Sequence, residues 1–342
     1  MSESAPARLS VVIVTYNSAD ALERSLPPLV EQLRDGDELV VVDNASADGS
    51  RAAVRRLAPA ARLVENADNL GFAAAANQGA EAASGDVILL LNPDAVVAAG
   101  FREAITGPPG EWAAWMGLVT MDSGRAVNTS GNVIHYTGVS WAGQAGEPLA
   151  AAPAEPREVT FASGACLAVR ADAWRRHGGF SPHFFMYCED ADLSLRLRLA
   201  GETVGIEPAA RVDHDYDFAK GAAKWRLLER NRWALLLRTY PGALLALVGP
   251  ALAATELALL AISFAGGWGG QKLRANVDVM RALPRLLRER RAIQSQRRIS
   301  AREFASRLTP DLSSEYLGRA RRSRLLRVGL RAYWRVVCAL LR

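Results

Sequence analysis

Short apolar runs alternate with amphipathic, alanine-rich stretches through the first hundred residues. The segments 9–16, 38–44 and 85–94 each hold consecutive aliphatic or β-branched residues and end in polar ones. Residues 20–33, between the first two runs, carry apolar side chains at helical spacing. This alternation is typical of βαβ units around a buried parallel sheet. The first part of the chain is therefore predicted to be α/β.

The middle of the chain is less regular. Clusters of Gly, Pro and Ala occupy residues 107–110 and 142–156. They predict loops around an antiparallel extension of the same sheet, not a separate domain. A patterned block follows at 161–201, and its last part predicts a helix that ends at Gly201.

An apolar run at 243–265 opens the last part of the chain. It is long enough to cross a bilayer, but Pro250, Glu256 and its many small residues also fit a buried helical hairpin. Residues 272–298 then place Leu, Met and Ile on one side and arginines on the other, as in a helix that lies in a membrane interface. We expect a domain at 1–240 and a helical, membrane-associating extension at 241–342.

Charge divides the chain at the apolar run. Residues 266–342 hold 19 Lys and Arg against 5 Asp and Glu, whereas residues 1–265 hold 22 against 31. A basic tail attracts either nucleic acid or anionic lipid, for the same electrostatic reason. Because this tail follows an apolar run, we favour an anionic membrane surface and no nucleic acid as its partner. The composition, 50% hydrophobic and 23% charged, excludes a fibrous or disordered chain.

The cysteines and the N-terminus bear on the compartment. The three cysteines, Cys166, Cys188 and Cys338, lack metal-ligand spacing, so neither a disulfide framework nor a zinc site is expected. No apolar stretch precedes Val11, so no secretory signal is expected. These features favour a catalytic part in the cytoplasm, at a membrane surface as a peripheral or monotopic protein. The oligomeric state stays open.

Polar residues follow the predicted strands. In an open α/β sheet ligands bind beyond the carboxyl ends of the strands, so these side chains are expected to converge, although turn and helix-capping roles are the alternative. They are Thr15, Tyr16, Asn17, Asp43, Asn44, Asn92 and Asp94. Neither GxGxxG after the first strand nor GxxxxGK[ST] occurs, which argues against dinucleotide and P-loop chemistry. The acids, with Asp68 on an intervening loop, instead favour a metal-bound nucleotide.

Two motifs contain candidate metal ligands. Asn92-Pro93-Asp94 ends an apolar strand abruptly, and Pro93 fixes the turn that presents Asp94. His214 lies between two aspartates after a predicted strand, where an imidazole suits metal ligation. A plain turn and a structural histidine are the alternatives.

A third motif gathers carboxylates. Glu189, Asp190 and Asp192 begin a predicted helix, directly after the aromatic run 184–187. Acids at a helix N-terminus favour the helix dipole, so simple capping is one interpretation. The other interpretation is that the aromatic run excludes water and raises the pKa of one carboxylate towards the range of a general base.

Six segments together resemble the inverting GT-A glycosyltransferases of family 2, in particular bacterial rhamnosyltransferase-like members. The segments are VVIVTYNS, VVDNASADGS, NADNLGFAAAANQG, GDVILLLNPDA, SGACLAVR and GGFSPHFFMYCEDADLSLRLRLAG, within residues 9–300. The resemblance implies a Rossmann-like, mixed nucleotide-binding sheet flanked by helices. It also implies transfer of a sugar from a nucleotide-sugar donor in one inverting displacement, with Mg²⁺ or Mn²⁺ as cofactor.

The resemblance also assigns roles. The donor nucleotide is expected to contact residues on the first two strands and the 68–71 loop, together with the first residue of the DXD-type motif. These residues are Thr15, Tyr16, Asn17, Asp43, Asp68, Asn69, Gly71 and Asn92. Because Asn92 replaces the first acid of that motif, Asp94 and His214 are expected to hold the metal. Asp190 is the expected general base, and Glu189 and Asp192 are expected to orient the acceptor and the backbone.

The resemblance leans towards dTDP-L-rhamnose as donor and a polyprenyl-diphosphate-linked sugar, such as GlcNAc-diphosphoryl-polyprenol, as acceptor. The acceptor diphosphate is expected near basic residues after the catalytic block, namely Lys220, Lys224, Arg226, Arg230 and Arg232. UDP-galactofuranose or another UDP-hexose is the alternative donor. A non-catalytic module that binds a sugar nucleotide or lipid is a further alternative. A sugar-nucleotide pyrophosphorylase is disfavoured, since no Gly-rich basic loop follows the first strand.

Overall fold

The computed structural model describes residues 7–107, 110–214, 221–313 and 323–341. By its internal contacts the chain forms two units. The first consists of residues 1–131, 142–193 and 203–216, and the second of residues 132–141, 194–202 and 217–342.

The first unit is built around a ten-stranded mixed sheet. Four of its strands run parallel to one another, β1 (Leu9–Thr15), β2 (Glu38–Asp43), β3 (Arg62–Glu65) and β4 (Val87–Leu91), in the order β4-β1-β2-β3, so that β3 lies at one edge of the sheet. The sheet order continues from β4 through β11 (Cys166–Arg170), β6 (Ala114–Met121) and β12 (Val204–Asp213) to β10 (Arg157–Glu158). Strand β11 is antiparallel to both of its neighbours. The predicted α/β sheet with an antiparallel extension is confirmed.

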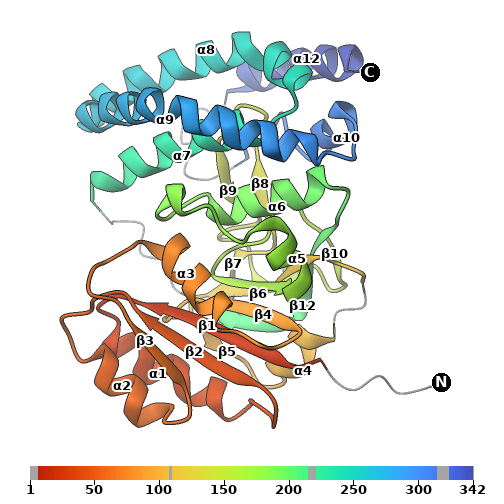
Figure 1. The fold of residues 1–342 in the computed structure, drawn as a ribbon. Coiled ribbons are helices and arrows are strands. Elements are labelled where there is room, and N and C mark those ends of the chain that lie inside the picture. Colours follow the sequence, from red (N-terminus) through yellow and green to blue (C-terminus); the bar gives the residue numbers. More distant parts are fainter. Residues whose placement is uncertain (1–6, 108–109, 215–220, 314–322, 342) are drawn as a thin grey trace. The chain divides into compact units, whose positions relative to one another are not determined.

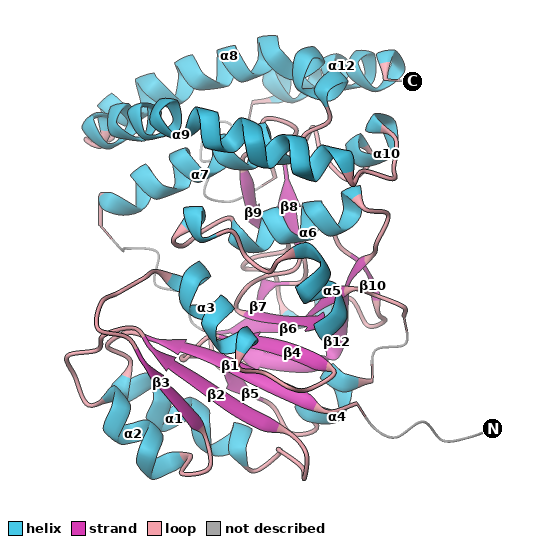
Figure 2. Ribbon diagram, viewed as in Figure 1, coloured by secondary structure: helices cyan, strands magenta, loops and turns pink. Residues whose placement is uncertain are grey.

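Short strands and helices complete this unit. β5 (Val96–Val97) pairs with β12, and β7 (Ala126–Thr129) pairs with β6. Helices α1 (Ala19–Val30) and α2 (Ser50–Leu57) cover one face of the sheet, and α3 (Phe72–Glu81) and α5 (Ala171–His177) cover the other (Figures 1 and 2). The remaining helices are α4 (Phe101–Thr106), the 3₁₀ turns η1 (Leu149–Ala151) and η2 (Pro182–Phe184), and α6 (Glu189–Leu199), whose last turns group with the second unit.

Burial explains why β1 and β4 lie inside the sheet. All seven residues of β1 and all five of β4 are buried, as expected for parallel strands that are covered on both faces. Gly79 of α3 lies directly over Val12 of β1, so this helix packs closely on the sheet because the glycine has no side chain. The core therefore fixes the carboxyl ends of β1, β2 and β4, where the candidate site lies.

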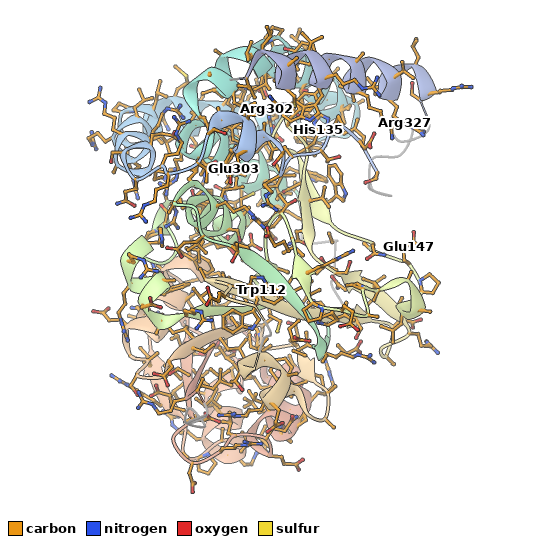
Figure 3. All side chains as sticks on the ribbon, turned by 90° about the vertical axis from the view of Figure 1, so that its right-hand side faces the viewer. Trp112, His135, Glu147, Arg302, Glu303 and Arg327 are labelled. Carbon is orange, nitrogen blue, oxygen red and sulfur yellow. The ribbon has the colours of Figure 1, made fainter. Side chains whose placement is uncertain are left out.

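The second unit is mainly helical. It contains α7 (Ala223–Thr239), α8 (Gly242–Ala265), α9 (Gly269–Ser295), α10 (Ala301–Ala305) and α12 (Arg324–Leu340), with the hairpin β8 (Asn132–Ile134) and β9 (Ser140–Ala142). Helix α7 packs mainly on α9, and α8 contacts α9, α10 and α12. Tyr136, next to His135 (labelled in Figure 3), stacks on Trp334 of α12 with the ring centroids 4.8 Å apart.

Helix α8 coincides with the predicted apolar run. In the part of the chain that the structure describes, it is the single helix long and apolar enough to cross a membrane, and few of its residues are buried. The expected boundary between residues 240 and 241 stays a prediction. By contacts, α7 already groups with the C-terminal helices, as do residues 132–141.

Candidate active site

The carboxyl ends of β1 and β2 lie side by side. Thr15 and Asp43 are paired in the register of the two strands, and the Asn44 backbone N–H donates to the Thr15 carbonyl oxygen at 2.8 Å. Strand β4 flanks β1 on its other side, with Leu91 opposite Ile13, so Asn92 follows at the same edge. The ends of these three strands therefore lie at one edge of the sheet, as predicted, and the convergence of their side chains on one ligand stays a prediction.

Two buried oxygens at this edge lack partners. Among the described residues, neither Thr15 Oγ1 nor Asp43 Oδ1 has a hydrogen-bond partner, although both atoms are buried. The other carboxylate oxygen of Asp43 accepts from the Ser46 backbone N–H at 3.1 Å and lies 3.7 Å from Arg51 Nε. Leaving a buried polar atom unpaired costs about 1–3 kcal/mol. Hydroxyl or amide donors of a ligand would remove that cost, which fits the predicted nucleotide pocket.

The residues next to this pair have different environments. Tyr16 is exposed, and Asn17 has a left-handed backbone with φ of 51°. The Asn17 side-chain oxygen accepts from the Ala47 N–H at 2.8 Å, so this residue joins the loops after β1 and β2. Its turn role is thus visible directly, and contact with a donor stays a prediction.

The 68–71 loop is fixed to the end of β2. Asn44 Nδ2 donates to Asn69 Oδ1 at 2.9 Å, and the same oxygen accepts from the Gly71 N–H at 2.9 Å. Gly71 has φ of +83°, and the Phe185 ring occupies the space beside its Cα. The Asp68 side chain is exposed. The structure therefore places the predicted loop residues together, with Asp68 open to solvent.

The candidate metal ligands face one another. His214 Nε2 lies 3.1 Å from Asp94 Oδ1 and 3.2 Å from Asn92 Nδ2. His214 is 5% exposed, whereas the Asp94 carboxylate is 39% exposed, so the pair has one buried side and one open side. The His214 backbone is held between Thr120 and Asn128, which bond its N–H and its carbonyl oxygen at 2.9 and 2.8 Å.

These residues fit a divalent ion. Ligands at bonds of about 2.1 Å in octahedral geometry lie about 3 Å apart, which is the separation of the Asp94 oxygen and the His214 nitrogen. No group of three or more His, Cys, Asp or Glu side chains with metal-binding geometry occurs in the described residues, which omit 215–220. The donor set supplied here is one carboxylate and one imidazole, because the amide nitrogen of Asn92 is the atom that faces His214, so most of the coordination would come from substrate phosphates or water.

The acidic segment begins α6. Asp190 accepts hydrogen bonds from two backbone N–H groups, Gly164 at 2.9 Å and Ala191 at 2.7 Å. The Asn92 N–H donates to the carbonyl oxygen of Ala165, the residue after Gly164. Residues 164–165 therefore bond both the acidic segment and the segment that begins with Asn92, so the two predicted motifs lie close together.

Burial changes the acidity of this segment. It raises the pKa of Glu189 to about 8, and the negative charges of Asp190 and Asp192 add to the rise. Burial also raises the pKa of Asp190, while its two backbone donors oppose the rise. A carboxylate with a raised pKa is therefore present in this segment, as predicted, and Glu189 is the clearest case. The Asp192 side chain is fully buried and does not reach solvent, and its expected role in orienting the acceptor and the backbone stays a prediction.

The backbone before these acids is strained. Phe185, Tyr187 and Cys188 have φ of 62°, 70° and 66°, a backbone region that residues other than glycine rarely adopt. Each such residue costs on the order of 1–3 kcal/mol, and such strain clusters at functional sites. The Phe185 carbonyl oxygen accepts from the Ala73 N–H at 3.0 Å, which attaches the strained segment to α3.

The predicted acceptor residues belong to the second unit. Lys220 lies outside the described residues, Lys224 is buried, and Arg230 Nε donates to Asn231 at 2.9 Å. No finding tests their role, so it stays a prediction. Arg226 and Arg232, also expected near the acceptor diphosphate, are both ion-paired, and their role in acceptor binding stays a prediction as well. Arg226 forms a two-point ion pair with Asp278, and the guanidinium of Arg232 is committed to Glu229, Glu256 and the Thr137 carbonyl.

Sequence reasoning missed Gly164 and Phe185. Both lie in segments that the motif comparison quoted, but their contributions are a backbone N–H and the position of a ring. Neither produces a chemical signal in a list of side chains.

Known proteins identify the family. The model of "Glycosyl transferase family 2" matches residues 10–107. The N-acetylglucosaminyl-diphospho-decaprenol L-rhamnosyltransferase of Mycobacterium tuberculosis is 32% identical over 236 residues, which are 60% of this chain and 75% of that protein. The chain belongs to glycosyltransferase family 2. Another relative is the rhamnosyltransferase WbbL of Escherichia coli K12, 36% identical over 80 residues, 22% of this chain and 30% of that protein.

Solved structures agree on the fold of this family 2 enzyme. S. aureus TarS in complex with UDP aligns with a TM-score of 0.52 and 15% identity, over 97% of this chain and 90% of that chain. GalNAc-T7 with UDP, GalNAc and Mn²⁺ aligns with a TM-score of 0.58 and 16% identity, over 70% of this chain. This chain spans about half of GalNAc-T7, 49%. The predicted GT-A fold is confirmed, and the protein is a glycosyltransferase.

Proposed function

We propose that this family 2 glycosyltransferase transfers L-rhamnose from dTDP-L-rhamnose to a polyprenyl-diphosphate-linked GlcNAc, with inversion at the anomeric carbon. The observation that carries the proposal is the 32% identity to a rhamnosyltransferase that acts on N-acetylglucosaminyl-diphospho-decaprenol, over three quarters of that protein. Lipid-linked acceptors favour a location at the cytoplasmic face of the membrane, with residues 1–240 as the transferase domain and 241–342 as a membrane-associating extension.

The donor would lie along the carboxyl ends of β1, β2 and β4. Thr15 and Asp43 each present a buried oxygen without a partner in the described residues, which suits the base and ribose hydroxyls of a nucleotide. Asp94 and His214 would hold Mn²⁺ or Mg²⁺ at the diphosphate end. A bound divalent ion stabilises the negative charge that develops on the leaving nucleoside diphosphate.

Asp190 is the carboxylate best placed to receive the acceptor proton. Its two backbone hydrogen bonds orient the group, and its residue is partly exposed, whereas Glu189 is buried. As the acceptor hydroxyl attacks the anomeric carbon, its proton passes to Asp190 and the nucleoside diphosphate leaves from the opposite face. Glu189, protonated near neutral pH by its raised pKa, holds this segment without adding a second negative charge.

The test is transfer to polyprenyl-diphospho-GlcNAc from dTDP-L-rhamnose, UDP-galactofuranose and other UDP-hexoses, with Mn²⁺ or with EDTA. We expect transfer from dTDP-L-rhamnose, an inverted anomeric centre by NMR, and loss of product in EDTA. Asp190→Asn should lower kcat about 10²–10⁴-fold. The matched control is Asp172→Asn on α5, because Asp172 is an exposed acid paired with Arg176. Turnover of a UDP-sugar alone would replace the rhamnose proposal, and full activity of Asp190→Asn would reject Asp190 as base.

A further inference from the structure

Helix α8 has its polar and apolar sides reversed relative to an ordinary surface helix. Leu257, Ile262 and Phe264 are 69%, 56% and 61% exposed. The other strongly exposed positions between the second turn and the last are all alanine or proline. They are Ala246, Pro250, Ala253, Ala254, Ala258, Ala261 and Ala265. A surface helix in water normally shows charged or polar residues on that side.

The polar side chains of α8 lie on its covered side instead. Ser263 is fully buried, and Glu256, the one charged residue of the helix, is largely covered. Glu256 contacts Arg232 Nη2 of α7 at 2.8 Å and Lys272 Nζ of α9 at 2.6 Å. Lys272 is itself fully buried and also lies 2.5 Å from Glu229. Two acids and two bases therefore neutralise one another beneath α8.

This buried network fixes how α8 can meet a membrane. Burial alone would raise the pKa of Glu256, but Lys272 and Arg232 hold it below the usual value, so the group is ionised at neutral pH. A helix that crossed a bilayer by itself would carry this carboxylate into hydrocarbon, which is costly. Because α7 and α9 hold one side of α8 along the ion pairs, only its opposite, apolar side is left for lipid.

A second helix adds basic charge next to exposed apolar residues. Helix α12 contains four arginines and no acid. Its Arg324, Arg327 (labelled in Figure 3), Arg331 and Arg335 recur at helical spacing on one side, and of these Arg331 forms a two-point ion pair with Asp311. On another side Leu325 is 86% exposed, and Val336 and Leu340 are also exposed. Arginines beside exposed aliphatic residues suit the headgroup level of an anionic bilayer, where basic residues are attracted to the negative surface potential. Helices α8 and α12 contact each other and lie at the same end of their unit (Figure 1).

We propose that the outward side of α8, with the exposed apolar side of α12, docks onto an anionic phospholipid bilayer, and that α8 lies in the plane of the interface and does not cross the membrane. This deepens the membrane part of the proposed function and rests on it for the cellular setting. The surface needs no donor or acceptor to bind lipid, so it can be tested apart from sugar transfer.

The first test is flotation of the full chain with vesicles of phosphatidylcholine, with or without phosphatidylglycerol. The variant Leu257→Glu/Ile262→Glu/Phe264→Glu changes three exposed side chains. The control Ala52→Glu/Ala60→Glu/Ala99→Glu adds the same charge at exposed positions of the other unit. We expect salt-sensitive binding to the anionic vesicles, at least about a tenfold loss of partitioning in the α8 variant, and none in the control. Equal binding of the two variants, or an α8-dependent dimer without vesicle binding, overturns the proposal.

The second test measures depth. Nitroxides at Ala246, Ala254 and Ala261, in a chain with Cys188→Ala and Cys338→Ala, report three exposed positions along one side of α8. The 24-residue helix is about 36 Å long. In-plane docking gives three similar, shallow depths by power saturation. A deep value at Ala254 between two shallow ones would show a spanning helix and overturn the proposal. Absence of rhamnosyl transfer would change neither readout, so failure of the proposed function is distinguishable.

Discussion

Gly71 and Phe185 are in direct contact across the two parts of the candidate active site. A Cβ built on Gly71 would lie 2.6 Å from Phe185 Cγ, a distance that real Cβ atoms do not adopt. Gly71 ends the loop that carries Asp68 and Asn69, and Phe185 belongs to the strained segment before Glu189 and Asp190. The position of the acids therefore depends on the conformation of the predicted donor loop.

Gly71→Ala tests this dependence. The added methyl must move the Phe185 ring, and alanine at φ of +83° is strained in any case, so we expect about 2 kcal/mol of destabilisation and about a hundredfold fall in kcat. Gly100→Ala is the matched control, because Gly100 has φ of +75° and nothing within 4 Å of the added Cβ. It should lose similar backbone stability but keep its kcat. Equal kcat values for the two variants would mean that Phe185 does not position the acids.

Glu189 should make stability depend on pH. Its pKa of about 8 in the folded protein is raised above the usual value of 4.5 by burial and by the charges of Asp190 and Asp192, so the protonated carboxyl favours the folded state. That contribution is complete below the unfolded pKa and is lost as pH rises through the folded one, between about 4.5 and 8. Glu189→Gln cannot ionise, and we expect its stability relative to wild type to increase from pH 5 to pH 8.

Urea unfolding at several pH values measures this difference. Asp172→Asn is the control. Asp172 is exposed and its paired arginine lowers its pKa, so Asp172 stays ionised over this interval and the variant's stability relative to wild type should not change with pH. A constant difference between Glu189→Gln and wild type across the interval would show that Glu189 ionises as an ordinary surface acid does.

The elements and the site differ in how far the sequence predicts them. The strands at 9–15, 38–43 and 87–91 follow from apolar runs that end in polar residues, and the strand-end position of Asp43 and Asn92 follows with them. The hydrogen bond from the Gly164 N–H to Asp190 cannot be predicted in this way, because a backbone N–H has no signature in the pattern of side chains. It depends on β11 pairing antiparallel with β4, which is a long-range choice.

The helical unit gives a second example. The sequence marks Glu256 as unfavourable for a spanning helix, but it does not reveal Arg232 and Lys272 as partners. Those partners are 24 and 16 residues away on other helices. Helical periodicity predicts which side of a helix is buried, but it does not predict which other helix packs against that side. Likewise, residues 132–141 join this unit although no composition change marks them.

The metal motif predicts a preference between ions. Imidazole nitrogen is a softer donor than oxygen, so a site with His214 and Asp94 should bind Mn²⁺ more tightly than Mg²⁺ in the presence of a nucleoside diphosphate. His214→Ala should weaken Mn²⁺ binding about tenfold, or about 1.4 kcal/mol, and reduce the preference over Mg²⁺. The resonance of free Mn²⁺ measured by EPR gives both quantities without turnover. His177→Ala, which changes a residue outside the site, is the control, and equal Mn²⁺ affinity in the two variants would remove His214 from the metal site.

The buried ion pairs beneath α8 should matter much more than exposed ones. Lys272→Met leaves Glu229 and Glu256 buried with one cation between them, so we expect about 3–5 kcal/mol of destabilisation. Arg285→Met is the matched comparison, because Arg285 is about half exposed and pairs with Glu289 one turn away, an arrangement that contributes at most about 1 kcal/mol. Chemical denaturation in detergent-free buffer measures both. The double variant Lys272→Met/Glu256→Gln should recover part of the loss, since one acid, Glu229, then remains paired with one base, Arg232. Similar losses for Lys272→Met and Arg285→Met would mean that the network is solvated and does not hold α8 in place.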